Sequence, residues 1–125
     1  MKIRIWGWLL VATIGIFFLW RIMMFAGIEN LSPESFLKMR KKHPGPLIDV
    51  REPHEFQSGH LSDAINIPLS QVNQITKKWD KDEPLYLYCR SGSRSASAAR
   101  QLKKAGYKVY NLHGGIQAWP YPLSS

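Results

Sequence analysis

Charged residues are distributed so unevenly along this chain that its first 28 residues and the remainder require different surroundings. All nine acidic residues lie at or beyond Glu29, whereas the positions before it carry only three charged side chains, on Lys2, Arg4 and Arg21. Residues 5–28 hold just one of these charges. A helix of that length would extend about 36 Å, which exceeds the hydrocarbon core of a bilayer at about 30 Å. The sequence therefore predicts a membrane-spanning helix followed by a separate polar domain.

The apolar segment also has the flanking residues of a membrane anchor. Arg21 lies near its end, from where a long basic side chain can snorkel to the interface. Three tryptophans lie towards its two ends, where indole rings favour the boundary between lipid and water. We therefore predict a single-pass transmembrane anchor in residues 1–28, which contacts the lipid bilayer through residues 5–28.

Two other interpretations of this segment are open. Lys2 and Arg4 would suit the basic start of a cleaved signal peptide, but Phe25 stands where the cleavage site needs a small residue. A buried helix of a soluble protein is disfavoured, because no polar face marks a solvated side. Basic residues are more numerous just after the segment than before it, which favours a domain facing the cytoplasm over one facing the periplasm.

The polar domain, residues 29–125, has 14 basic and 9 acidic side chains. An excess of this size is compatible with binding of anionic lipids or small anionic substrates, and the commoner alternative is an ordinary solvated basic surface. No nucleic-acid partner is expected, because no recognised motif interleaves these charges with aromatic residues. The single cysteine excludes an internal disulfide, and the four histidines lack the spacing of metal ligands, so neither a metal nor another cofactor is expected.

Turn and capping signals divide the domain into alternating helices and strands. Ser32 suits the N-cap of a helix that begins with Pro33, and Gly106 stands where a glycine ends a later helix. Such alternation is typical of an α/β domain with a mostly parallel sheet. The expected helices cover residues 33–43, 70–79 and 93–105, the expected strands cover residues 47–50, 85–89 and 107–112, and a short last helix precedes Pro120.

The only cysteine, Cys89, stands where an expected buried strand gives way to an expected helix. Ligands of open α/β sheets bind beyond the carboxyl ends of the strands, so this is the position of a site residue. Gly92 and its small neighbours allow backbone N–H groups to point inward as an anion-binding nest at a helix N-terminus. Such a nest, together with Arg90 and Arg94, lowers the pKa of a thiol and populates the nucleophilic thiolate. The alternative role, a small buried apolar side chain, is the commonest one for a lone cysteine.

Three segments give the domain a resemblance to a known family. They are "LIDVREPHEFQSGHLSDAINIP", "LYLYCRSGSRS" and "NLHGGIQAW", in this order. Together they resemble the single-domain rhodanese family over residues 30–119. The resemblance implies a five-stranded parallel sheet flanked by helices, with Cys89 as a nucleophile that carries a sulfane sulfur as a persulfide. It also implies a structural role for Asp49 and Arg51 and a substrate-binding cradle formed by Arg90, Ser91, Gly92, Ser93 and Arg94.

The chemistry that this resemblance implies defines the expected partners. Cys89 would attack the outer sulfur of thiosulfate or of another sulfane-sulfur donor, while Arg90 or Arg94 meets the charge of the departing sulfite. Cyanide, a small thiol or a protein thiol would then accept the sulfur in a ping-pong cycle. The expected function is that of a membrane-anchored sulfurtransferase.

Two other functions remain open. A phosphatase or arsenate reductase of the same fold is disfavoured, because its C-x5-R motif needs an arginine where this chain has Ser95. A membrane-tethered binding module without catalysis is disfavoured by the presence of Cys89 together with both loop arginines. Near the end of the chain, Gly114 and Gly115 are interpreted as turn glycines.

Overall fold

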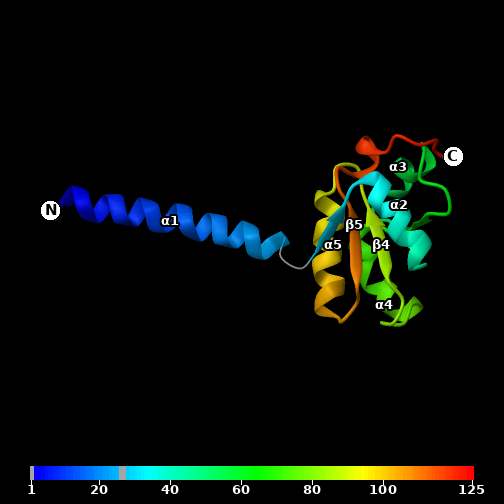
Figure 1. Cartoon of the computed structure of the whole chain (residues 1–125), viewed down its shortest axis with the longest axis horizontal. Helices are drawn as coiled ribbons and strands as arrows, with labels where there is room; N and C mark the ends of the chain where they lie inside the picture. Colours follow the sequence, from blue (N-terminus) through cyan, green and yellow to red (C-terminus); the bar gives the residue numbers. More distant parts are fainter. Residues whose placement is uncertain (1, 26–27) are drawn as a thin grey trace.

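The computed structural model of the 125-residue chain describes residues 2–25 and 28–125 (Figure 1). Within its first helix, side chains are described for residues 4–20 and 22. The helices are α1 (Lys2–Phe25), α2 (Pro33–Lys42), α3 (Pro53–Gln57), α4 (Ile75–Lys78) and α5 (Ser93–Lys104), with two 3₁₀ helices, η1 (Leu69–Gln74) and η2 (Gly115–Ala118). The strands are β1 (Glu29–Leu31), β2 (Leu47–Asp49), β3 (Ile65–Asn66), β4 (Leu85–Tyr88) and β5 (Val109–Leu112).

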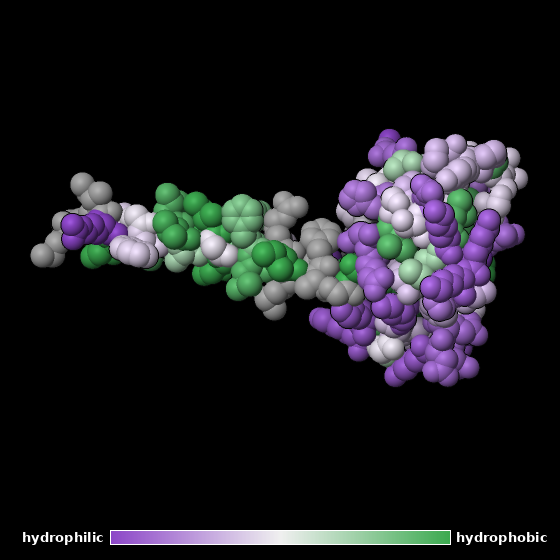
Figure 2. All heavy atoms as spheres, in the orientation of Figure 1, coloured by the Kyte–Doolittle hydropathy of each residue, from purple (hydrophilic) through white to green (hydrophobic). Residues whose placement is uncertain are grey.

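Helix α1 is apolar and projects away from the α/β domain (Figure 1). Its apolar side chains are exposed, as the green spheres of Figure 2 show, and Trp6 and Trp8 are 71% and 74% exposed. Within the described part of the chain, no helix has both the length and the apolarity needed to cross a membrane. The structure therefore does not support the transmembrane anchor expected for residues 1–28. The expected snorkelling of Arg21 concerns a side chain outside the described ones.

The five strands form one parallel sheet in the order β1-β5-β4-β2-β3, with helices on both faces (Figure 1). The expectation of a five-stranded parallel sheet flanked by helices is confirmed. The central strand β4 pairs with β5 on one side, where Leu85 lies opposite Val109, and with β2 on the other, where Tyr86 lies opposite Leu47. Cys89 follows this central strand directly.

Strand β4 is buried on both faces, and its alternate residues belong to two different cores. Leu85 and Leu87, followed by Cys89, pack into the apolar cluster that α4 and α5 cover. Tyr86 and Tyr88 pack into the cluster that α2 covers on the other face. Side chains of a strand point alternately to its two faces, so a strand between two layers of helices needs a continuous apolar run.

The helix expected over residues 70–79 is instead two short helices. The 3₁₀ helix η1 contains a residue with non-helical dihedral angles, Gln71 (φ −113°, ψ 17°), and α4 adds a single α-helical turn. Val72 and Ile75 are nevertheless buried, as the helical spacing predicted. Burial of these two side chains fixes the segment, because so short a helix gains little from its own hydrogen bonds. The short last helix is also of the 3₁₀ type.

Because the strands are parallel, the sheet has two different ends. We call the end at which the strands finish the carboxyl end, and the end at which they start the amino end. Each crossover helix runs back from the carboxyl end to the amino end, so α2, α4 and α5 have their last turns at the amino end. The carboxyl end is where ligands of such sheets bind.

Candidate active site

Cys89 lies at the carboxyl end of the sheet, one residue beyond β4. It is a free thiol and is fully buried. Its Sγ accepts a hydrogen bond from the backbone N–H of Gly92, at 3.1 Å, and another from the hydroxyl of Ser95, at 3.4 Å. The sulfur is thus held by donors from the following loop and from the first turn of α5.

Gly92 gives the loop the backbone conformation that directs its N–H at the sulfur. Its φ of +107° is one that residues with a Cβ rarely adopt. It is also the N-cap residue of α5. Its carbonyl oxygen accepts hydrogen bonds from the N–H of Ala96 (3.0 Å) and Nδ2 of Asn111 (3.3 Å), and it lies 3.2 Å from the hydroxyl of Ser95, where it competes with Sγ for the one hydroxyl proton. These bonds fix the residue whose N–H faces Cys89.

The start of η2 holds the other side of the loop. The N–H groups of Ile116 and Gln117 donate to the carbonyl oxygens of Cys89 and Arg90, at 2.9 and 3.2 Å. This close approach requires glycine at position 115, because a Cβ there would lie 2.4 Å from the carbonyl oxygen of Arg90. With these carbonyl groups turned towards η2, the N–H groups of the loop are left to face the sulfur.

These surroundings lower the pKa of Cys89. Burial acts in the opposite direction, because it favours the neutral thiol and raises the pKa. Hydrogen bonds from the hydroxyl and N–H of Ser95 and from the N–H groups of Gly92 and Ser91 outweigh this effect. The N-terminus of α5 adds partial positive charge at the same place. The site therefore stabilises the thiolate, which is the nucleophilic form of cysteine.

The two arginines of the loop differ in their surroundings. Arg94 forms a bidentate ion pair with Glu55 of α3, with N–O distances of 2.7 and 2.9 Å. The hydrogen bonds from Arg94 lower the pKa of Glu55 to about 2. Arg90 is exposed, and with Glu55 and Arg51 it lines a cleft of about 440 Å³ beside the loop. Since Glu55 compensates the charge of Arg94, Arg90 is the better placed of the two to meet an anion.

Asp49 and Arg51 form an ion pair at the end of β2, and both side chains are buried. Nη2 of Arg51 lies 2.7 Å from Oδ2 of Asp49 and 2.7 Å from the carbonyl oxygen of Gly59. Burial lowers the pKa of Arg51, but the hydrogen bond and charge of Asp49 outweigh burial and raise it. This pair ties the end of β2 to the segment after α3, and so supports the helix that carries Glu55.

The two serines of the predicted cradle lie on the outer side of the loop. Ser91 and Ser93 are exposed, and their hydroxyl oxygens lie 3.5 Å apart. Both line a cleft of about 450 Å³, together with Asn111 and His113. Their side chains are thus placed towards an incoming molecule, whereas the backbone of the loop faces the sulfur.

Two residues of the site were not predicted from the sequence. Ser95 follows Cys89 by six positions and lies in the first turn of the expected helix, so its spacing was an available signal for a second donor to the sulfur. Glu55 lies in the first turn of α3 and forms a capping box with Glu52, a pattern that indicates only the start of a helix. Its pairing with Arg94, 39 positions away, depends on the tertiary fold.

The comparison with known families agrees with this geometry. Residues 32–120 match the rhodanese-like domain. The match covers more than half of the chain, so the chain belongs to the rhodanese-like domain family.

Similar proteins include both characterised and uncharacterised relatives. The chain is 45% identical over 93 residues to the uncharacterized protein YqhL of Bacillus subtilis strain 168, with 74% of this chain and 72% of that protein covered. It is 33% identical over 100 residues to the thiosulfate sulfurtransferase GlpE of Pseudomonas putida, with 78% and 91% covered. Among solved structures, a rhodanese-related protein of Thermoplasma volcanium has a TM-score of 0.68 at 31% identity, with 77% of this chain and 97% of that chain covered.

Proposed function

We propose that this domain is a sulfurtransferase that takes a sulfane sulfur from thiosulfate or a related donor onto Cys89 and passes it to a thiophilic acceptor. The observation that carries the proposal is the set of hydrogen-bond donors around Sγ, which lowers the pKa of Cys89. Donors that stabilise a thiolate can also hold an anionic persulfide. The similarity to the thiosulfate sulfurtransferase GlpE supports thiosulfate as the donor.

The reaction has two displacement steps. The Cys89 thiolate attacks the outer sulfur of thiosulfate, a sulfur–sulfur bond forms to Sγ, and the bond to the central sulfur breaks, so sulfite leaves with the electron pair. The product is a Cys89 persulfide anion under the N–H groups of the loop. A nucleophile such as cyanide or a thiolate then attacks the terminal sulfur, and Cys89 leaves again as a thiolate.

The charges at the loop suggest how the donor is received. Arg90 is exposed beside the cleft, so it meets the charge of thiosulfate and of the departing sulfite. Arg94 is held by Glu55 and positions the first turn of α5. Because Cys89 is fully buried, the transfer includes movement of the side chains that cover the sulfur.

Mass spectrometry tests this function directly. After incubation of the reduced protein with thiosulfate, we expect one added sulfur atom on Cys89, which cyanide removes with release of thiocyanate. A Cys89→Ser variant is the matched control and should gain no sulfur. Full recovery of the unmodified thiol, or turnover of an aryl phosphate faster than sulfur transfer, would contradict the proposal.

We further propose that α1 holds the domain at a lipid bilayer, with the domain on the cytoplasmic side. The supporting observation is the exposure of apolar side chains over the described part of α1, where Trp6, Trp8 and Ile16 are each more than 60% exposed. A helix that is apolar on all sides is stable only where other apolar groups cover it, and lipid chains can do so. The basic residues that follow α1 support the cytoplasmic side.

Flotation with phosphatidylcholine vesicles tests this attachment. We expect the 125-residue chain to rise with the vesicles and to remain with them after a wash at high salt, because apolar contacts are not screened. External protease, applied to intact cells, should leave the domain uncut. Protein that stays at the bottom of the gradient would contradict the attachment, and cleavage in intact cells would contradict the cytoplasmic side.

A further inference from the structure

The net positive charge of the domain is confined to the amino end of its sheet. Nine basic and four acidic residues lie there, whereas the rest of residues 29–125 carry five of each. Seven of the nine basic residues lie in the last turns of helices: Arg40, Lys41 and Lys42 in α2, Lys77 and Lys78 in α4, and Lys103 and Lys104 in α5. The other two, Lys81 and Lys108, lie in the segments that lead into β4 and β5. The acidic residues are Glu29 and three in the loop between α4 and β4. We call these residues the amino-end surface.

Most of this charge is exposed to solvent. Eight of the nine basic residues are lysines, and all eight are exposed. Figure 2 shows hydrophilic colour gathered over the lower part of the domain, where α4 and α5 end in Figure 1. The three helix C-termini add about half a negative charge each, which offsets less than a third of the excess of five positive charges. A net positive field therefore remains at this end.

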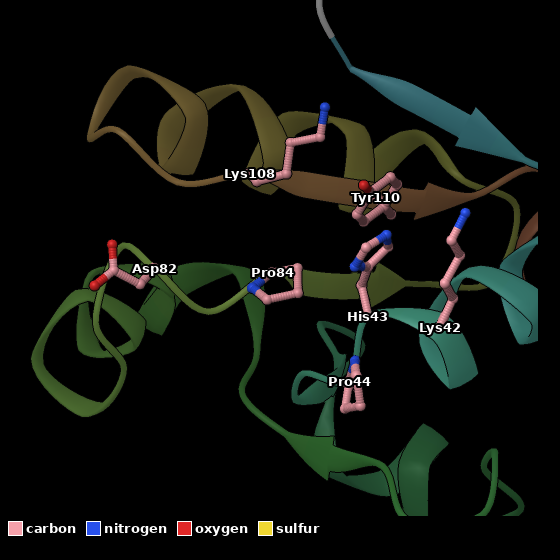
Figure 3. A pocket seen from close by; sticks show the side chains of 7 residues that line it. All are labelled: Lys42, His43, Pro44, Asp82, Pro84, Lys108 and Tyr110. Carbon is pink, nitrogen blue, oxygen red and sulfur yellow. The ribbon is translucent and has the colours of Figure 1, made fainter.

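A pocket of about 400 Å³ opens in the amino-end surface (Figure 3). Lys42 and His43, from the end of α2, lie on one side of it, and Lys108 and Tyr110, from the start of β5, lie on another. Asp82 lies at its far end and is the one acidic residue of the lining. Lys108 also pairs with Glu29 at 2.7 Å. Lys42 is therefore the lysine of this lining that no ion pair recorded among the described residues compensates, and the excess of positive charge lies on the exposed lysines around the pocket.

The chain enters the domain at this same end. Helix α1 ends at Phe25 and β1 starts at Glu29, so at most about 14 Å of extended chain separates them. The amino-end surface is therefore held close to whatever covers α1. Because this is an upper limit, the linker allows the lysines to approach a bilayer surface to within the screening length of about 8 Å at physiological salt.

We infer that the amino-end surface docks on the phosphate-bearing headgroups of anionic lipids, which leaves the carboxyl end with Cys89 facing away from the bilayer. The inference rests on the proposed attachment of α1 and adds the lipid class and the orientation of the domain. Nucleic acid fits this surface less well, because its pocket offers a single exposed ring, the imidazole of His43, while Tyr110 is buried, so successive bases would find no row of rings to stack on. An attached bilayer also presents its headgroups at a high local concentration, as a free anion does not.

Lysine labelling of the 125-residue chain on vesicles tests the inference. We would compare acetylation of Lys42 and Lys104 on phosphatidylcholine vesicles with acetylation on vesicles in which about a third of the lipid is phosphatidylglycerol. We expect at least about threefold slower labelling on the anionic vesicles, with the difference lost at 1 M salt. Lys38 is the internal control, because it lies one turn earlier in α2, pairs with Glu34 at 3.1 Å and should be labelled equally on both.

Each of the other possible results would contradict the inference, and each would do so for a different reason. Equal labelling of Lys42 on both kinds of vesicle, with the protein floating on both, would refute docking and leave the attachment of α1 intact. The same protection by free inorganic phosphate, or by RNA without vesicles, would replace the bilayer by that ligand. Protein that floats on neither vesicle would refute both the attachment and the docking, while persulfide formation in the same sample reports separately on the sulfurtransferase proposal.

Discussion

The two ends of the same sheet use charge in opposite ways. At the carboxyl end, the buried Asp49–Arg51 pair and the Glu55–Arg94 pair place their charges in contact and fix the segments around Cys89. At the amino end, exposed lysines predominate, and Lys108–Glu29 is the one ion pair recorded there among the described residues.

This difference shows two ways in which charge can act. At the carboxyl end, each charge acts through its position beside one partner, whereas at the amino end the charges act through their sum. Paired charges at short distance hold atoms in place and leave little net field, so single substitutions should matter there and salt should matter little. Unpaired exposed charges act together, so each one should contribute little alone and salt should weaken them all. Three of the following four pairs of substitutions compare the two ends with matched changes, and one compares two serines at the carboxyl end.

The largest expected effect is on sulfur transfer when the thiol is removed. Cys89→Ala should reduce thiosulfate:cyanide sulfurtransferase activity by at least about 10⁴-fold, because no other group of the site can carry the sulfur. Lys104→Ala, an exposed change at the amino end, should leave the activity within about twofold. Comparable losses for both variants would show that the carboxyl end has no special role in the reaction.

A second pair of variants compares two glycines with positive φ. Gly115→Ala should lower the free energy of unfolding by about 3 kcal/mol, because its Cβ would meet the carbonyl oxygen of Arg90 at 2.4 Å and displace the loop. It should also reduce activity per folded molecule. Gly106→Ala, at the end of α5, should cost about 1–2 kcal/mol, chiefly from backbone strain because its nearest neighbour is the flexible side chain of Lys81 at 3.2 Å, and should leave activity per folded molecule unchanged. Chemical denaturation and kinetics on the same samples would separate the two effects.

The hydroxyl of Ser95 offers a finer change at the sulfur. Ser95→Ala removes a donor to Sγ at 3.4 Å, so the pKa of Cys89 should rise and alkylation by iodoacetamide at pH 6 should slow about tenfold. Ser93→Ala, in the same turn but with its hydroxyl on the exposed side, should alkylate at the wild-type rate. Equal rates for the two variants would remove Ser95 from the set of donors that hold the thiolate.

The smallest expected effect concerns stability in acid. The pKa of Glu55 is lowered to about 2 by Arg94, so the ion pair stabilises the fold at pH above about 4.5 and this contribution is lost as the pH falls towards 2. Glu55→Gln should therefore lower the free energy of unfolding by less than about 1 kcal/mol at neutral pH and should reduce its loss between pH 4.5 and pH 2. Glu29→Gln removes the more exposed pair at the amino end and should have a still smaller effect. Identical acid profiles for wild type and Glu55→Gln would contradict the assignment.

The sequence predicted the elements that have a strong local pattern. The continuous apolar run of β4, the proline start of α2 and the glycine end of α5 each express one physical rule within a few residues. Strands β1 and β3 contain three and two residues, which is too few to show any hydrophobic period. Their place in the sheet is set by pairing with β5 and β2, and pairing is a tertiary property.

The site was predictable to the extent that it is local. Cys89, Gly92 and the start of α5 are consecutive features of one loop, so the anion-binding nest was visible in the sequence. The pairing of Arg94 with Glu55 was not, because it joins residues 39 positions apart. The sequence also showed lysines near the expected ends of helices. Their accumulation at one end of the sheet follows only from the parallel arrangement of the strands.

Titration of Cys89 tests the central claim most directly. The absorbance of the thiolate, measured against pH for the wild-type protein and corrected with Cys89→Ala, should show a pKa below the usual cysteine value of about 8.5. Burial alone would raise the pKa above that value, so the two possibilities differ in sign. Ionisation at or above pH 8.5 would contradict the claim that the loop and the start of α5 hold this sulfur as a thiolate.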